Sequence, residues 1–252
     1  MKMVSLASGS KGNAYLFESQ GALLLIDCGL SGRELVRRMD LVGADLRALK
    51  AVLVTHEHSD HTCGIARLRK ICPDAAFYAN LMTADVVGGD FYIFENGQPF
   101  QTGPFTIIPF SIPHDVSDPV GFVVMADGHV HFHATDIGSP LDSIGWHLSE
   151  ADSATLESNH DPVLLAQSNR PAEIIRRIRG PRGHLSNDEA ASLVERFASP
   201  KLKHLSLAHL SRDCNEAHIA YELMRETLLK AGLGNVDLEV LSQDEPGRVW
   251  EC

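Results

Sequence analysis

Residues 51–61 read AVLVTHEHSDH, and this stretch decides the fold. Its first five residues are apolar or β-branched, which predicts a strand that is buried on both faces of a sheet. The strand delivers a polar cluster at its C-terminal end, where the ligand sites of α/β sheets lie. Burying so many polar groups is costly unless a cation satisfies them. The potential metal ligands in this stretch are His56, His58, Asp60 and His61.

The chemistry of this cluster suits a pair of divalent metals. In a tight turn alternate side chains face opposite ways, so His56 and His58 can serve one metal while Asp60 and His61 serve a neighbour. Imidazole nitrogen and carboxylate oxygen are ligands for Zn, Mn or Fe. We expect two metal ions per chain, with zinc as the first choice and manganese or iron as alternatives. The competing interpretation is a solvated histidine-rich loop that holds no metal.

Composition is that of a globular enzyme. The chain has 252 residues, of which 44% are hydrophobic and 22% charged, and it contains no linker-like stretch. We therefore expect a single domain over residues 1–252. No segment approaches the about 20 apolar residues of a membrane-spanning helix, and the N-terminus lacks a signal-peptide core, which predicts a cytoplasmic protein with no membrane partner. Five cysteines with no CxxC pair argue against a disulfide framework and against a cysteine zinc site.

The remaining pattern alternates strands and helices. Two capping boxes, Ser31 with Glu34 and Ser186 with Glu189, predict the starts of helices. A further helix is expected at about 215–231. The expected strands cover residues 4–7, 13–17, 22–27, 51–55, 105–109, 120–125, 130–134 and 205–208. This arrangement predicts a layered α/β architecture.

The His-x-His-x-Asp-His pattern after a buried strand resembles the signature of the metallo-β-lactamase superfamily. The resemblance implies an α/β fold in four αββα layers, with two mixed sheets flanked by helices. It supplies further ligands, His114 in IPHD, Asp136 in ATDIG and His209 in LAHLS. It also implies that Asp27, in LIDCG, orients the ligand loop without binding metal.

The resemblance implies two metal sites that share one carboxylate. One metal is held by His56, His58, His114 and Asp136. The other is held by Asp60, His61, His209 and Asp136. Asp60 and the metals are then expected to activate a water molecule.

Departures from other members of the superfamily narrow the chemistry. Asp136 stands where antibiotic-hydrolysing relatives carry a cysteine, which disfavours that activity. His58 stands where redox di-iron relatives carry a carboxylate, which disfavours reduction of oxygen or nitric oxide. The interval from Asp136 to His209 is too short for the inserted domain of the larger RNA- and DNA-processing relatives.

A second pair of residues is similar to the proton relay of ribonuclease Z. Glu157 lies in LESNHD and His184 lies in RGHLSN, before the second capped helix. The likeness implies that His184 protonates the leaving oxygen and that Glu157 holds its imidazole in the required tautomer. The alternative is a buried Glu–His pair in which each side chain only satisfies the hydrogen-bonding needs of the other. His160, in the same LESNHD stretch, is expected to support the ligands or contact substrate.

Four motifs together resemble the single-domain bacterial WalJ (YycJ) exonuclease group. They are SLASGSKGN at 5–13, ESNHD at 157–161, RGHLSN at 182–187 and AHLSR at 208–212. The resemblance implies hydrolysis of double-stranded DNA from the 5′ end. The residues expected to contact substrate are Ser10, Lys11, Asn13, Arg179, Arg182 and Ser211.

The charge pattern bears on a nucleic-acid substrate. The net charge of −11 repels nucleic acid as a whole. Between residues 170 and 182, however, five arginines stand against the single acid Glu173, and such a cluster can grip a phosphate backbone. A solvated helix face is the alternative interpretation of this run.

Other functions stay open at the level of sequence. One is a small-molecule phosphodiesterase for cyclic or nucleotide substrates, and another is a ribonuclease Z-like RNA hydrolase. A non-catalytic binding protein is disfavoured by the complete ligand set. His129, His131 and His133 alternate along one expected strand, and we expect this trio to face solvent rather than a metal.

Overall fold

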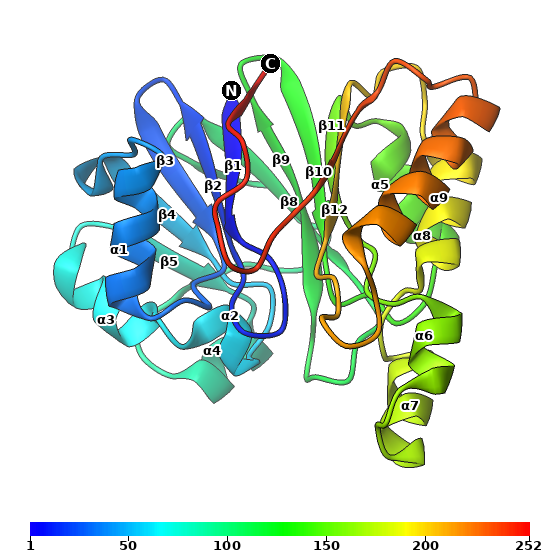
Figure 1. Ribbon diagram of the computed structural model, residues 1–252. Coiled ribbons are helices and arrows are strands. Elements are labelled where there is room, and N and C mark those ends of the chain that lie inside the picture. The colour runs from blue at the N-terminus through cyan, green and yellow to red at the C-terminus, as the bar shows by residue number, and fades with distance from the viewer. The chain divides into compact units, whose positions relative to one another are not determined.

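The computed structural model describes residues 1–252 (Figure 1). The helices are α1 (Gly32–Leu41), α2 (Ser59–Thr62), α3 (Ile65–Ile71), α4 (Leu81–Val87), α5 (Asp142–Ser149), α6 (Pro162–Gln167), α7 (Ala172–Ile178), α8 (Asn187–Phe197) and α9 (Ala217–Lys230), with a 3-10 helix η1 at Leu46–Ala48. None of these helices has the length and apolar character needed to span a membrane.

The strands form two mixed seven-stranded sheets with the orders β14-β1-β2-β3-β4-β5-β6 and β13-β12-β11-β10-β9-β8-β7. Their bounds are β1 (Lys2–Ala7), β2 (Ala14–Ser19), β3 (Ala22–Ile26), β4 (Leu49–Leu53), β5 (Ala76–Ala79), β6 (Tyr92–Ile93), β7 (Phe100–Thr102), β8 (Phe105–Ser111), β9 (Val120–Ala126), β10 (His129–Ala134), β11 (Ser153–Glu157), β12 (His204–Ala208), β13 (Asp237–Val240) and β14 (Trp250–Glu251). All eight expected strands are present, with ends that differ by a few residues.

The chain packs as two compact units. Unit 1 comprises residues 1–111, 116–129 and 241–252, and unit 2 comprises residues 112–115 and 130–240. The expectation of one domain over residues 1–252 stays a prediction.

Unit 1 contains an antiparallel meander, β1-β2-β3, that continues into the parallel strands β4, β5 and β6. Its core is aliphatic and includes Leu6, Leu25 and Val52 from the strands with Leu35 from α1 and Leu68 from α3. Figure 1 shows α1 and α3 beside this sheet. The parallel strands end together, so side chains that follow them gather at one edge.

Helix α1 starts as the sequence predicts, with a difference in the capping box. Ser31 Oγ accepts a hydrogen bond from the Glu34 backbone N–H at 3.3 Å. The Glu34 carboxylate binds Arg37 and Arg38 rather than returning to the cap. Arg38 is buried, and its Nη1 donates to the carbonyls of Leu6 and Gln243 at 2.7 and 2.9 Å. The arginine therefore ties the helix to the first strand and to the C-terminal segment.

Unit 2 is built on the parallel strands β10, β11, β12 and β13. Helices α8 and α9 lie side by side (Figure 1). The predicted capping box of α8 is complete, because Ser186 and Glu189 each bind the other's backbone N–H. Parallel strands are covered on both faces, so their sequences carry few exposed positions.

The expectation that the β10 histidines face solvent was wrong. His131 and His133 are fully buried, and His129 is 9% exposed. His131 lies between two hydroxyls of the neighbouring strand, with Nδ1 2.7 Å from Ser153 Oγ and Nε2 3.2 Å from Thr155 Oγ1. The physical reason is that a parallel strand in the interior of a sheet is buried on both faces, so alternation along the strand does not separate core from solvent.

Candidate metal centre

The predicted metal loop of unit 1 follows β4 and is held by the backbone of β3 and its continuation. Asp27 N donates to Leu53 O at 2.8 Å, and Cys28 N donates to His61 O at 2.7 Å. Gly29 permits this approach, because a Cβ there would lie 1.6 Å from the carbonyl oxygen of Asp60. The loop is therefore fixed by main-chain contacts before any metal is considered.

Asp27 connects the strand end to His61, one of the predicted metal ligands. Its fully buried carboxylate accepts from the Thr55 backbone N–H at 2.9 Å and lies 2.7 Å from His61 Nδ1. A carboxylate at Nδ1 fixes the tautomer and leaves Nε2 to act as a ligand. Asn13 Nδ2 lies 3.0 Å from that Nε2. Asp27 and Asn13 therefore both contact the predicted metal loop, and the orienting role of Asp27 stays a prediction.

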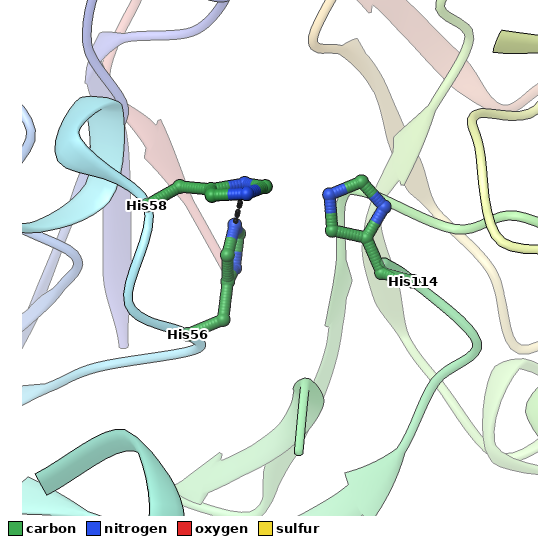
Figure 2. Close-up of side chains that lie close together, drawn as sticks. All are labelled: His56, His58 and His114. Atoms are coloured by element: carbon green, nitrogen blue, oxygen red, sulfur yellow. Dashed lines mark hydrogen bonds between the residues drawn. The ribbon is translucent and has the colours of Figure 1, made fainter. Parts of the chain in front are cut away.

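His56 and His58 face each other across the start of the loop. Nε2 of His56 lies 3.1 Å from Nδ1 of His58, and the rings meet edge to face with centroids 4.8 Å apart (Figure 2). Asp60 Oδ2 lies 3.6 Å from His61 Nε2. The four polar residues of the motif thus converge within unit 1, as the sequence predicts. A cation is the chemical group that would satisfy several imidazole lone pairs at once.

Unit 2 carries a second convergence of polar side chains at the ends of β10, β11 and β12. Asp136, Glu157, His184 and His209 each offer a ligand atom, and these atoms lie within 4.8 Å of one another. His209 Nε2 lies 3.7 Å from Asp136 Oδ1. His114 also belongs to this unit, and its Nε2 lies 3.8 Å from the same oxygen.

Backbone strain is concentrated at the predicted site residues. Five non-glycine residues have positive φ; two of them, Gln20 and Asp127, lie in hairpin turns. The other three are Asp27, Asp136 and His209, with φ of 60°, 60° and 56°. Each follows a strand, and left-handed backbone at such residues costs of order 1–3 kcal/mol, which points to a functional constraint.

Glu157 is the centre of the unit 2 cluster. Its Oε2 accepts from the backbone N–H groups of Ile137 and Leu185 at 2.7 and 3.1 Å. Its Oε1 lies 2.8 Å from His184 Nδ1 and 3.0 Å from His209 Nδ1. Burial opposes ionisation, but His184 and the hydrogen bonds from both histidines outweigh it and hold the pKa of Glu157 below its usual range. One ionised carboxylate therefore orients two imidazoles.

His114 is held in the form that binds metal. Its Nδ1 lies 3.0 Å from the carbonyl oxygen of Gly183, so Nδ1 carries the proton and Nε2 has the lone pair. Burial lowers the pKa of His114, with the Asp136 carboxylate opposing the shift. The neutral imidazole is thereby favoured.

Other predicted residues take varied positions. His160 is 2% exposed, its Nδ1 is buried without a hydrogen-bond partner, and burial lowers its pKa. Ser10 and Lys11 lie exposed in the turn between β1 and β2. Ser211 is buried and donates its backbone N–H to Asn159 O at 2.8 Å.

Sequence reasoning missed one supporting residue that the structure places beside a predicted ligand. Asn159 Nδ2 donates to the carbonyl oxygen of His209 at 2.7 Å and lies 3.3 Å from its Nδ1. Its position within the ESNHD motif was the available signal, and strand registry between β11 and β12 explains the contact.

The arginine run around α7 is partly engaged within the protein. Arg177 pairs with Asp115, and Arg170 pairs with Asp213 at 2.8 Å. Arg182 Nε donates to the carbonyl oxygen of His114 at 2.8 Å. Arg179 Nη2 donates to the carbonyl of Pro162 at 2.9 Å, and Arg176 is exposed with no acidic partner.

Comparison with known proteins identifies the class. The family model described as the β-lactamase superfamily domain matches residues 23–206, and the chain belongs to this superfamily. The fold is also that of the metallo-β-lactamase fold protein YhfI from Bacillus subtilis, with a TM-score of 0.73 and 21% identity over 100% of this chain and 99% of that structure. The predicted α/β fold, two mixed sheets flanked by helices, is confirmed.

Two curated relatives are similar over most of the chain. The exodeoxyribonuclease WalJ of Streptococcus pneumoniae is 33% identical over 247 residues, which cover 93% of this chain and 91% of the relative. The exodeoxyribonuclease YycJ of Bacillus anthracis is 30% identical over 237 residues, which cover 91% of this chain and 89% of the relative. The resemblance to the WalJ (YycJ) group that the motifs predict is confirmed. Together with the superfamily match, these relatives show that the protein is a metal-dependent hydrolase.

Proposed function

We propose that this protein is a dinuclear metal-dependent phosphodiesterase that acts as a 5′ to 3′ exonuclease on double-stranded DNA. The observation that carries the proposal is the buried Glu157 carboxylate, which contacts Nδ1 of both His184 and His209. One residue thereby links a proton donor to a metal ligand. The similarity to two exodeoxyribonucleases supports the choice of DNA.

The metal ligands are proposed to be the seven residues predicted from the sequence: His56, His58, Asp60, His61, His114, Asp136 and His209. Their local chemistry fits divalent metal. Nδ1 of His61, His114 and His209 faces a carboxylate or a carbonyl oxygen, which leaves Nε2 of each ring to act as the ligand. Zinc suits this donor set best, and manganese and iron are the alternatives. When bound, the metals supply Lewis acidity and a nucleophilic water.

His184 is proposed to donate a proton to the leaving group, and Glu157 is proposed to orient His184. His184 Nδ1 faces Glu157, so its Nε2 is left to donate a proton to the departing oxygen. The His184 side chain is 20% exposed, which lets substrate reach it, whereas Glu157 is fully buried. The buried carboxylate keeps the imidazole ring in one orientation and one tautomer.

Substrate contact is proposed for exposed cations of both units. Arg176 and Arg179 offer charge on and just after α7, and Lys11 offers charge in unit 1. Arg177 is neutralised by Asp115 and contributes less. Each phosphate contact of this kind strengthens binding regardless of base sequence and makes it dependent on salt.

The test is hydrolysis of end-labelled duplex DNA by zinc-loaded protein beside three variants. We expect stepwise loss from the 5′ end by the native protein. His184→Ala should lower the rate by about 10²–10⁴-fold while retaining metal, and His58→Ala should lose both metal and activity. His218→Ala, which changes an exposed histidine, is the matched control.

The same assay separates the alternatives. Duplex RNA, single-stranded RNA and a cyclic nucleotide are offered in parallel with DNA. No cleavage of DNA with zinc, manganese or iron, together with turnover of RNA or the small phosphodiester, would overturn the DNA assignment and leave a metal-dependent phosphodiesterase.

A further inference from the structure

Three buried polar side chains of unit 2, Ser158, Asn187 and Asn215, form a closed hydrogen-bonded triangle. They are 1%, 1% and 6% exposed. Ser158 Oγ donates to Asn187 Oδ1 at 2.7 Å, and Asn187 Nδ2 donates to Asn215 Oδ1 at 2.9 Å. Asn215 Nδ2 closes the triangle by donating to the carbonyl oxygen of Ser158 and to Asn187 Oδ1, both at 2.9 Å. This group, the polar triangle, has no part in the proposed metal site or proton relay.

Every side-chain nitrogen and oxygen of the polar triangle has a hydrogen-bond partner within it. Asn215 Oδ1 also accepts from the Glu216 backbone N–H at 2.9 Å. A buried polar network in which each member is satisfied specifies one arrangement, whereas an amide that loses its partner costs free energy. Because the three side chains are buried, substrate does not reach them. Any effect on the reaction must therefore pass through the backbone segments that carry them.

Each of these backbone segments also carries one residue of the proposed proton relay or metal site. The pairs are Glu157 with Ser158, His184 with Asn187, and His209 with Asn215. The first segment is the end of β11, the second leads into α8 and the third follows β12. The members of a pair are one, three and six residues apart, so a shift of the triangle moves each segment close to its relay or ligand residue.

Backbone hydrogen bonds place the first segment between the other two. Asn187 N donates to His160 O at 2.9 Å, and Asp161 N donates to Cys214 O at 2.9 Å. The amide pair of Asn187 and Asn215 then joins the second segment to the third directly. The three segments are therefore linked in all three combinations, and displacement of one breaks hydrogen bonds to the others.

We propose that the polar triangle is a positioning device that sets the distances from the Glu157 carboxylate to His184 and His209. Glu157 Oε1 lies 2.8 and 3.0 Å from the two Nδ1 atoms, and a hydrogen bond of this kind weakens steeply when its groups separate or tilt. The triangle is uncharged, so it fixes this geometry without changing the charge of the site. The inference rests on the proposed function, because that proposal assigns the roles of the relay and of the metal ligand.

The experiment compares zinc-loaded native protein with Asn187→Ala, Ser158→Ala and Leu228→Ala. The first readout is kcat and KM on end-labelled duplex DNA with zinc in excess. The second is zinc affinity from competition with a chelator, and the third is the side-chain N–H signals of His184 and His209 by NMR of isotope-labelled histidine. Leu228→Ala is the matched control, because it removes a buried side chain of α9 outside the three segments.

We expect Asn187→Ala to lower kcat by about 10²-fold, the effect of a misplacement of about 1 Å, with KM changed less than about threefold. Its zinc affinity should fall by about 10–100-fold, and the N–H signals of both histidines should shift. Ser158→Ala should lower kcat by about tenfold, because Asn215 Nδ2 still binds Asn187 Oδ1, and this variant gives the answer if Asn187→Ala does not fold. Leu228→Ala should leave kcat, zinc affinity and both signals at their native values.

The three readouts separate this inference from the proposed function. Native kcat, zinc affinity and N–H signals in both triangle variants, or changes no larger than those of Leu228→Ala, would overturn the positioning role even when the native protein cleaves DNA. If the native protein does not cleave DNA but the triangle variants still bind zinc more weakly and shift both signals, the proposed function fails and the positioning role stands.

Discussion

Replacing Glu157 by Gln tests the link between the two histidines of unit 2. The carboxylate has two acceptor oxygens, one for the backbone N–H groups of Ile137 and Leu185 and one for the imidazoles of His184 and His209. An amide has one oxygen and one NH₂ group. The backbone donors cannot change, so the amide oxygen stays with them and the NH₂ group faces both Nδ1 atoms.

The NH₂ group forces both rings into the other tautomer. Each Nδ1 must then accept, so the proton moves to Nε2, which in His209 is the proposed metal-binding atom. In a catalytic triad the wrong tautomer alone lowers kcat about 10⁴-fold, or about 5.5 kcal/mol. Loss of a supporting acceptor lowers metal affinity about 10–100-fold. We therefore expect Glu157→Gln to lower the rate by up to about 10⁴-fold and the zinc affinity by about 10–100-fold.

The assay has two readouts that do not depend on each other. Hydrolysis of labelled duplex DNA gives the rate, and competition with a chelator gives zinc affinity. Glu195→Gln, which makes the same change at an exposed position of α8, should alter neither by more than twofold. The reasoning is refuted if Glu157→Gln keeps native zinc affinity and native turnover, because the carboxylate would then only fill space.

Three further predictions concern stability. Arg38→Met should lower the free energy of unfolding by about 3 kcal/mol in urea titrations, since it removes the donor to the buried carbonyl of Leu6 and to the partly buried carbonyl of Gln243; an unchanged midpoint would contradict this. Hydrogen bonds from Arg37 and Arg38 lower the pKa of Glu34 to about 2, so its contribution is full above about pH 4.5 and is lost as pH falls toward 2. The free energy of unfolding of Glu34→Gln should therefore fall less between pH 6 and pH 3 than that of the native protein. Equal falls in the two proteins would show that Glu34 does not contribute in this way. Removing metal with a chelator should lower Tm by about 10 °C, and adding zinc back should restore it. The reason is that a ligand at a thousandfold excess over its Kd adds about 4 kcal/mol to the free energy of unfolding.

The sequence by itself determined the parts of this protein that depend on local pattern. The apolar run before His56, the cluster of four predicted ligands and the complete capping box at Ser186 all lie within short stretches of sequence. The positions of eight strands and of helices α1, α8 and α9 follow from sequence patterns, and the dispersed predicted ligands follow from resemblance to a superfamily whose motifs recur in order. These features need no knowledge of which segments meet in space.

Only the tertiary structure decided how those parts contact one another. The shared carboxylate of Glu157, the contact of Asn159 with His209 and the pairing of Arg177 with Asp115 join residues from 27 to 62 positions apart. The burial of His131 depends on what covers the sheet and not on alternation along its strand. Hydrogen bonding and burial are properties of neighbours in space, and strand registry sets those neighbours, so the sequence named the chemical groups and the fold determined their partners.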